Sequence, residues 1–231
     1  MHKLNFTILF CSLVSFAFSQ TPGGDYSSPF PYTYGESFEN RGFKEKLGDA
    51  IEGSPLLFDD WQSGEVILKD GEKYMVERLN FYPMGNKFLY KHNDSTYEFV
   101  DNVAQITVYD KNDANQTTTT MVFRNDIDPE SDDYVQLLDS GKITIFEHLQ
   151  KKPEGENYSN GIVNNSRNFV LRTTTYALQN KTVTPIKFDV ASLEQITADK
   201  SDEVKTYIKH NGLKIKHEAD FLKAINYYNS L

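Results

Sequence analysis

Apolar and polar residues alternate in short runs through the middle of the chain, with the period typical of half-buried β-strands. Residues 65–69 and 73–79 form the clearest pair, because the Asp70-Gly71 dipeptide between them tolerates the positive φ angles of a tight hairpin turn. Further strands are predicted at residues 87–91, 96–100, 103–109, 117–123, 134–138, 142–150 and 168–176. Such regularly spaced short strands favour an antiparallel meander that forms a sandwich or a partly closed barrel.

The segment between the last two predicted strands, 151–167, is rich in Pro, Gly, Asn, Ser and Glu. This composition predicts an exposed loop. After Pro185 the apolar period becomes helical, with Asp189 as a cap before the first helix and Asn211-Gly212 as the end of the second. Three short helices are predicted from the apolar residues Val190, Leu193 and Ile196, then Val204, Tyr207 and Ile208, then Phe221, Leu222, Ile225 and Tyr228.

These helices are too short to be stable alone, so they must bury their apolar faces against one another or the sheet. The predicted fold class is therefore α+β and mainly β. A β-rich body spans residues 53–188, and a helical C-terminal segment at 189–231 packs on it.

The first residues resemble a secretory signal peptide. A short positive start ending at Lys3 precedes an apolar run that ends in Ala17-Phe18-Ser19, and small residues at these positions suit cleavage between Ser19 and Gln20. The run is short for a membrane span, although an uncleaved anchor is the alternative. Cleavage would remove Cys11, the only cysteine, and leave a cysteine-free mature chain without a transmembrane span. Residues 20–52, which begin with several Pro and Gly, are predicted to be a flexible tether.

Composition narrows the function classes. The chain has 24 Lys and Arg against 33 Asp and Glu, a net charge of -9. A net negative charge argues against nucleic acid as a partner, because the neutralisation of phosphates by Lys and Arg supplies most of the affinity of proteins for nucleic acids. With 39% hydrophobic and 13% aromatic residues, the chain is too apolar for an acidic disordered tail and is expected to fold as a globular unit.

The sequence shows only weak signs of motifs for metal binding or catalysis. The histidines have no zinc-ligand spacing, and the acidic run 126–132 lacks the Gly and Glu that a calcium loop places at its sixth and twelfth positions. Neither a nucleophile motif nor a nucleotide-binding glycine loop occurs. We therefore predict no catalytic residue, no cofactor and no metal site, and the chain is not expected to be an enzyme. Trp61, Tyr74 and Tyr90 are the candidates for a binding surface, with burial in the core as the simpler interpretation of each.

Three groups of residues resemble a family of uncharacterised secreted proteins from Bacteroidota. The first is Gly-Ser-Pro-Leu-Leu-Phe-Asp-Asp-Trp at 53–61, followed by the hairpin; the second is Tyr-Val-Gln-Leu-Leu-Asp-Ser-Gly-Lys at 134–142. The third lies in the C-terminal helices, Tyr-Ile-Lys at 207–209 and Asn-Tyr-Tyr-Asn at 226–229. The resemblance implies an extracytoplasmic bacterial protein with a β-rich body and a helical tail. It implies no activity.

Two functions follow as hypotheses. The first is an exported, non-catalytic interaction protein of the periplasm, the outer-membrane surface or the secreted fraction, with an unknown envelope protein or glycan as its partner. Its contact surface would be a sheet face or an open sheet edge, where a partner can add a strand. The alternative is a small-molecule or glycan-binding module, or a weak hydrolase, that uses the sheet face.

Overall fold

The computed structural model describes residues 51–92, 95–99, 103–112, 117–155, 157–159, 162–164 and 167–231. The predicted signal peptide and its cleavage site, Ser19 and Gln20, lie outside the described residues. So does the predicted tether, except for its last two residues. These two, Ile51 and Glu52, form a short strand at the edge of the sheet.

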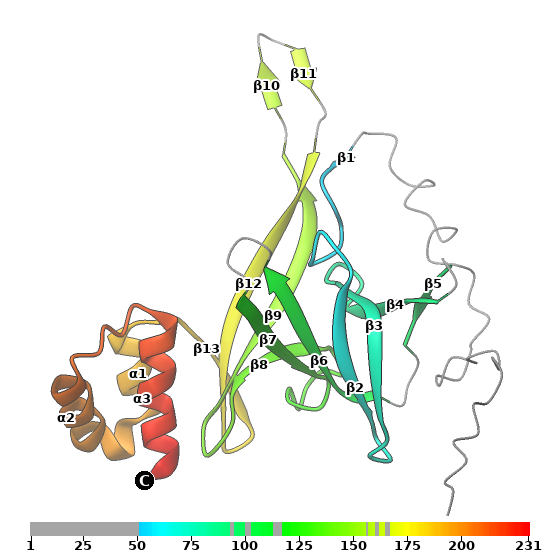
Figure 1. Ribbon diagram of the computed structural model, residues 1–231. Coiled ribbons are helices and arrows are strands. Elements are labelled where there is room, and N and C mark those ends of the chain that lie inside the picture. The colour runs from blue at the N-terminus through cyan, green and yellow to red at the C-terminus, as the bar shows by residue number, and fades with distance from the viewer. Residues whose placement is uncertain are drawn as a thin grey trace, which may run out of the picture.

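One large sheet dominates the molecule and is not closed into a barrel (Figure 1). Its strands are β1 (Ile51–Glu52), β2 (Gln62–Leu68), β3 (Lys73–Tyr82), β4 (Lys87–His92), β5 (Ser95–Glu98), β6 (Val103–Asn112), β7 (Thr117–Arg124), β8 (Val135–Asp139), β9 (Thr144–Glu154), β12 (Arg167–Gln179) and β13 (Thr182–Ile186). A separate two-stranded ladder, β10 (Asn157–Ser159) with β11 (Ile162–Asn164), continues beyond the ends of β9 and β12 (Figure 1). The predicted fold class, mainly β with short C-terminal helices, is confirmed.

The strand order is β1-β12-β9-β8-β7-β6-β2-β3-β4-β5, with β13 also paired to β12. Two meanders are therefore joined side by side, because β6 pairs with β2 and not with β5, its neighbour in sequence. All the ladders are antiparallel except that of β1 with β12. The predicted single meander is thus wrong at one connection. Local alternation of apolar residues locates strands but does not say which distant strand each one pairs with.

Two hydrophobic clusters stabilise the fold. The first lies mainly in the β2–β7 part of the sheet, with Leu149 of β9, and has an aromatic centre, in which Phe81, Phe88 and Phe123 are almost fully buried and their ring centroids lie 4.7 to 5.3 Å apart. Tilted and edge-on rings at such distances add to the stabilisation from burial. The second cluster is mostly aliphatic and joins the helices to β8, β9, β12 and β13 through residues such as Ile145 and Ile225.

A buried polar residue, Asn80 of β3, fixes the segment that leads into β2. Its side chain accepts hydrogen bonds from the backbone N–H groups of Phe58 and Phe81 and donates to the carbonyls of Phe58 and Asp60. Asn80 is fully buried, so these bonds replace the water that its amide would otherwise need. The segment preceding β2 is thereby tied to the body.

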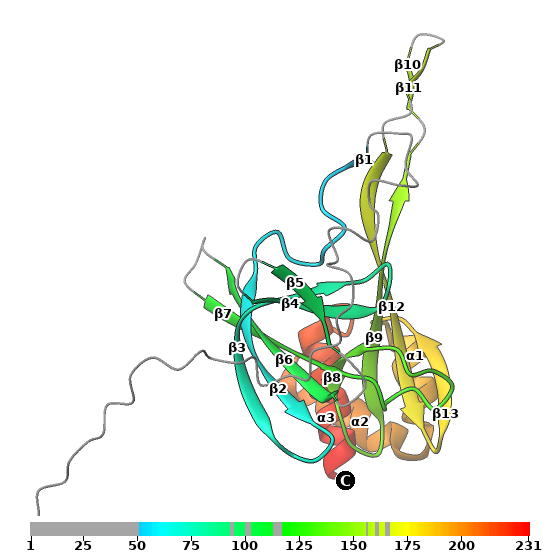
Figure 2. The ribbon, with the colours of Figure 1, turned by 90° about the vertical axis from the view of Figure 1, so that its right-hand side faces the viewer.

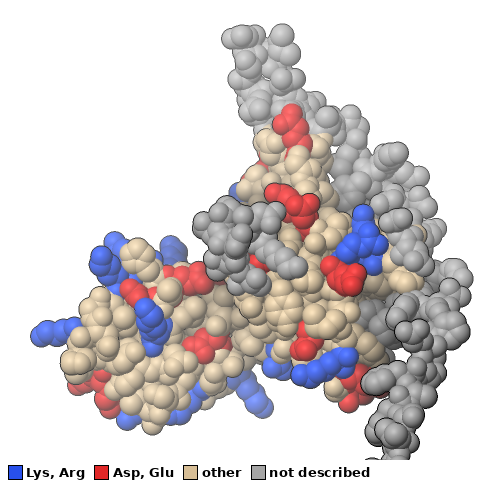
Figure 3. Space-filling view, in the orientation of Figure 1, with Lys and Arg blue, Asp and Glu red and all other residues tan. Residues whose placement is uncertain are grey.

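Three α-helices, α1 (Val190–Ile196), α2 (Ser201–Asn211) and α3 (Glu218–Ser230), form a layer beside β13 and the lower part of β12 (Figure 1). The predicted ends are confirmed. The Asp189 carboxylate accepts a hydrogen bond from the Ser192 N–H at 2.8 Å, and Gly212 ends α2 with a φ of 61°. On this layer Figure 3 shows Lys and Arg side chains interspersed with Asp and Glu, in line with short ion pairs such as Lys205 with Glu194.

The helical layer is also fastened to the sheet by a reciprocal pair of hydrogen bonds. The Asn229 side chain accepts from the backbone N–H of Ile143 and donates to its carbonyl, both at 2.9 Å. A Cβ atom added at Gly141 would lie within 3 Å of the Asn229 side chain. The turn between β8 and β9 therefore requires glycine at position 141 where α3 approaches it.

The segment predicted to be a loop, 151–167, is largely strand, and this prediction is wrong. β9 continues to Glu154, β12 begins at Arg167, and β10 and β11 lie between them. A further strand, β13, was not predicted at all. The first error comes from the loop-like composition of 151–167, although its Pro153 lies within β9, and the second from ending the strand pattern at Pro185, which lies within β13.

Candidate functional site

The two edges of β12 differ sharply in their pairing. One edge is paired with β9 without interruption from Asn168 to Leu178. The other edge meets β1 only at Arg167 and Asn168, and it meets β13 only from Thr175 onward. Figure 2 shows β12 running between these two short partners. Among the described residues, no strand pairs with this edge between β1 and β13.

The turn between β12 and β13 shows which β12 residues direct their backbone groups toward this edge. Asn180 and Lys181 both have positive φ angles, 51° and 65°, and form a two-residue hairpin turn between Gln179 and Thr182. The residues that flank such a turn form a hydrogen-bonded pair, and bonded pairs then recur at every second residue. Thr175 therefore directs its N–H and C=O toward the side that β13 occupies.

Two prolines agree with this alternation. Pro185 lies opposite Tyr176 and Pro153 lies opposite Phe169, both at non-bonded positions of their ladders, where the missing N–H removes no hydrogen bond. The ladder of β9 with β12 has no register shift. Leu171 and Thr173 are therefore in step with Thr175, and their N–H and C=O groups point toward the open edge.

We call residues 170–174 of β12 the β12 slot. Five residues of extended chain span about 17 Å. Val170 and Leu171 are 37% and 43% exposed, which is high for large apolar side chains on neighbouring positions of a strand, and Thr173 and Thr174 are exposed as well. Because successive residues face opposite sides of a sheet, the slot is uncovered on both faces and along its edge.

The one charged side chain in the slot, Arg172, is held in place by a neighbouring strand. Its Nε and Nη2 donate to the two carboxylate oxygens of Glu154 on β9, at 2.6 and 2.7 Å. This pairing holds the pKa of Glu154 below its usual range and raises that of Arg172, in both cases chiefly through the hydrogen bonds. The guanidinium is thereby fixed in direction on one face of the slot.

The opposite end of the sheet has a different edge. β5 spans only Ser95–Glu98, and Glu98 accepts a hydrogen bond from Lys87 of β4 at 2.6 Å. Short edge strands and charged side chains both discourage the addition of another strand. Compared with β5, the β12 slot is therefore the better candidate for strand addition.

A cleft of about 910 Å³ lies under the segment that connects β7 to β8. Two of its acidic residues have partners within the chain: Asp126 forms a two-point ion pair with Arg124, which lowers the pKa of the Asp126 carboxyl, and the Asp128 carboxylate lies 3.3 Å from the His148 ring nitrogen Nε2. The Asn86 side chain holds the far end of the segment by bonding both the N–H and the C=O of Tyr134. Within the described residues, no group of three or more His, Cys, Asp or Glu could hold a metal ion.

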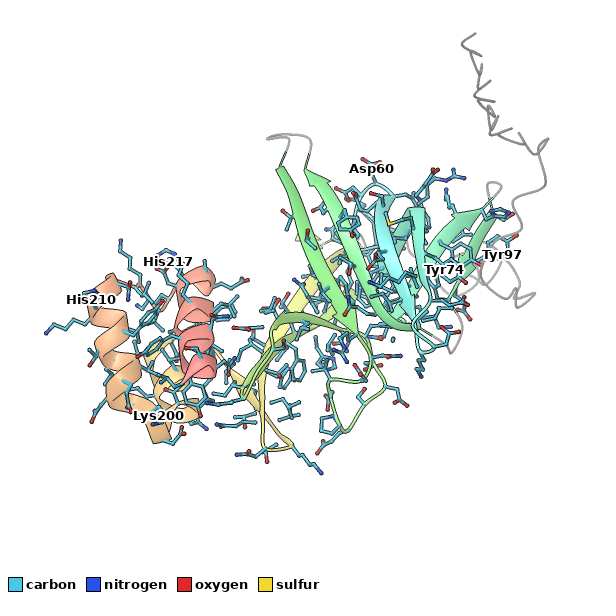
Figure 4. All side chains as sticks on the ribbon, turned by 60° about the horizontal axis from the view of Figure 1, so that its bottom comes forward. Asp60, Tyr74, Tyr97, Lys200, His210 and His217 are labelled. Carbon is cyan, nitrogen blue, oxygen red and sulfur yellow. The ribbon has the colours of Figure 1, made fainter. Side chains whose placement is uncertain are left out.

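The candidates Trp61, Tyr74 and Tyr90 do not share one surface. Tyr90 is buried and stacks on Tyr97, Tyr74 donates a hydrogen bond to Glu72 near the β2–β3 turn, and Trp61 has the Lys91 ammonium 5.0 Å above its ring. Along β3, Tyr74 and the residue that faces Tyr90, Leu79, are about 16 Å apart in an extended chain. Figure 4 also places His210 and His217 in the helical layer, away from Tyr74 and Tyr97.

The sequence predicted a strand over 168–176 but did not identify the β12 slot as a site. The slot can be recognised because β12 pairs with β9 over a long stretch but with β1 and β13 only over short ones. This difference is a property of the assembled sheet and not of the local sequence. Exposed apolar residues at 170 and 171 become informative only once the strand is known to have a free edge.

Comparisons with protein-family models, with curated proteins and with solved structures returned no match. The resemblance to secreted Bacteroidota proteins thus remains a prediction. None of the helices within the described residues has both the length and the apolar character needed to cross a membrane.

Proposed function

We propose that the chain is an exported, non-catalytic interaction protein of the bacterial periplasm or envelope, and that the β12 slot is its contact surface. The observation that carries the proposal is the interrupted edge of β12, where Leu171 and Thr173 present backbone donors and acceptors between β1 and β13. Unpaired backbone groups on a sheet edge can take up a strand from another polypeptide. Export is supported by the pattern of residues 1–19.

Site-specific photo-crosslinking in the native host tests this function. A photoreactive phenylalanine analogue replaces Leu171 in one variant and Val190, which is 54% exposed on helix α1, in a control. A partner in the envelope fraction is expected to cross-link from position 171 and not from position 190. Equal labelling from both positions, or none from 171, contradicts the proposal.

Export is tested on the same material. Intact-mass analysis of the protein from the envelope or medium is expected to give a chain that begins at Gln20. A cytosolic protein that retains Met1 contradicts the assignment to the periplasm or envelope.

A second candidate function is binding of a small molecule or glycan, and the cleft under the β7–β8 segment is the observation that favours it. Its lining mixes Lys69 and Lys87 with several carboxylates, which suits a polar ligand. A thermal-shift screen of sugars and small polar metabolites tests it. A ligand that raises the melting temperature of wild type but not of an Asn86→Ala variant supports this function, and a screen without hits removes it.

A further inference from the structure

The length of the β12 slot limits what can occupy it. The slot offers five residues, while β12 itself spans 13 residues. If a second copy of the chain paired its own β12 here, the rest of that strand would collide with β1 or with β13, which already hold the adjacent positions. The occupant is therefore a short extended segment whose ends leave the plane of the sheet.

The side chains around the slot favour a particular pattern of residues in this segment. Leu171 and Thr173 lie on one face and Val170, Arg172 and Thr174 on the other, because side chains alternate along a strand. Apolar or β-branched residues opposite Leu171 and Thr173 would cover the exposed leucine. An occupant that is apolar at these two positions thus buries surface that the chain alone leaves in water.

The charged side chains near the slot indicate which kind of residue the occupant has between those two positions. On the face of Arg172, β9 places Lys152 opposite Val170, so two cations lie near the centre of the slot, whereas Lys151, opposite Leu171, lies on the other face and donates to the carbonyl of Leu56. On this face the carboxylate near the centre is Glu154, which is bonded to Arg172; Glu52 lies farther away at the β1 end, and Glu147 accepts from Thr175 on the other face. The centre therefore has an excess of positive charge, and a carboxylate opposite Arg172 complements it.

From these features we infer that the β12 slot binds an extended peptide segment of about five residues, antiparallel to β12, with an acidic residue opposite Arg172 and apolar residues on either side of it. The inference rests on the proposed function and names the chemistry of its partner. In antiparallel pairing, Leu171 and Thr173 each form a hydrogen-bonded pair with one apolar residue of the peptide. Each pair exchanges two backbone hydrogen bonds. Specificity comes from the central carboxylate and affinity from the backbone bonds.

The probe is the capped peptide Thr-Val-Glu-Val-Thr, titrated into isotope-labelled protein that begins at Gln20 and followed by NMR. Its amide shifts are expected to concentrate at residues 170–174. Replacing the central Glu by Lys is expected to weaken binding about tenfold or more, since the like charges then face each other. Equal binding of the Glu and Lys peptides overturns the inference.

Methylating the peptide backbone tests the pairing itself. In the antiparallel arrangement the two Val N–H groups point at β12 and the Glu N–H points away, so N-methylation of both valines should abolish binding and N-methylation of the Glu should preserve it. Equal effects of the two modifications, or the reverse order, overturn the antiparallel pairing.

A matched protein variant uses the same alternation. Leu171→Pro together with Thr173→Pro removes two edge N–H groups but no hydrogen bond to β9, as Pro153 and Pro185 already show at equivalent positions. The double variant is expected to keep the fold, checked by its circular dichroism and melting temperature, and to lose at least about tenfold in peptide affinity. Val190→Thr, at an exposed apolar position of α1 outside the slot, is the control and should bind within about twofold of wild type.

If the double proline variant does not fold, Thr173→Pro alone decides the point, because it removes a single edge N–H. Unchanged affinity in a folded proline variant overturns the inference.

The peptide result and the cross-linking result are independent. A partner cross-linked from position 171 together with no peptide binding leaves the proposed function standing and removes only the acidic, strand-like occupant.

Discussion

The body of the sheet and the β12 slot use the same backbone geometry but meet different surroundings. In the body, Ile106 and Phe123 lie on strands paired along both edges, and both side chains are fully buried. In the slot, Val170 and Leu171 lie on the part of β12 that is paired along one edge only, with both side chains exposed. The body is therefore stabilised by its own residues, whereas the slot leaves backbone bonds and apolar surface that another polypeptide can use.

The largest expected effect comes from breaking the aromatic centre of the body. Phe123→Ala removes a fully buried ring that contacts Phe81 and Phe88, and it is expected to lower the free energy of unfolding by about 3–5 kcal/mol. Leu171→Ala in the slot should change it by about 0.5 kcal/mol or less. Urea unfolding followed by fluorescence measures both, and similar losses in the two variants would remove the contrast between the two regions.

A smaller effect is expected where the helical layer is fastened to the sheet. Asn229→Ala leaves the N–H and C=O of Ile143 without their partner and should cost about 1–3 kcal/mol. Asn226→Ala, exposed on the same helix, is the control and should lie within about 0.5 kcal/mol of wild type. Equal melting temperatures of the two variants would show that this attachment contributes nothing.

The smallest effect depends on pH and concerns Glu147 on β9. Burial raises the pKa of its carboxyl above the ordinary 4.5, although the hydrogen bond from the Thr175 hydroxyl opposes the shift. The folded chain therefore holds this proton more tightly than the unfolded chain does, and the free energy of unfolding falls as the pH rises through this range.

Glu147→Gln keeps an acceptor for Thr175 but has no charge to bury. The variant is expected to melt at a higher temperature than wild type at pH 7, and the difference should shrink as the pH is lowered past 4.5. A difference that does not depend on pH would show that the carboxylate charge is not the cause.

The sequence predicted those features of the fold that local patterns determine. Asp70-Gly71 located the first hairpin, and Asp189 and Gly212 located two helix ends, because turn and cap chemistry acts over a few residues. It did not predict that β6 pairs with β2, since that contact joins residues far apart in the chain. Nor did it predict β13, which contains Pro185. A proline disrupts a strand only where its N–H would have donated a hydrogen bond, and Pro185 lies at a non-bonded position of the ladder with β12.

The candidate site was harder to predict for the same reason. Trp61, Tyr74 and Tyr90 were chosen for their chemistry, and the sheet places them in separate contacts. Leu171 and Thr173 carry no unusual chemistry. They stand out only because β1 and β13 stop short of them, and the point where a partner strand stops depends on the whole topology.

The central claim is that Leu171 and Thr173 direct unpaired backbone groups toward the open edge, and residue-specific amide hydrogen exchange tests it most directly. In the folded chain without a partner, the amides of Leu171 and Thr173 are expected to exchange at least about tenfold faster than those of Val170, Arg172 and Thr174, which donate to β9. Equal protection across all five residues would show that the edge is already occupied and would contradict the account.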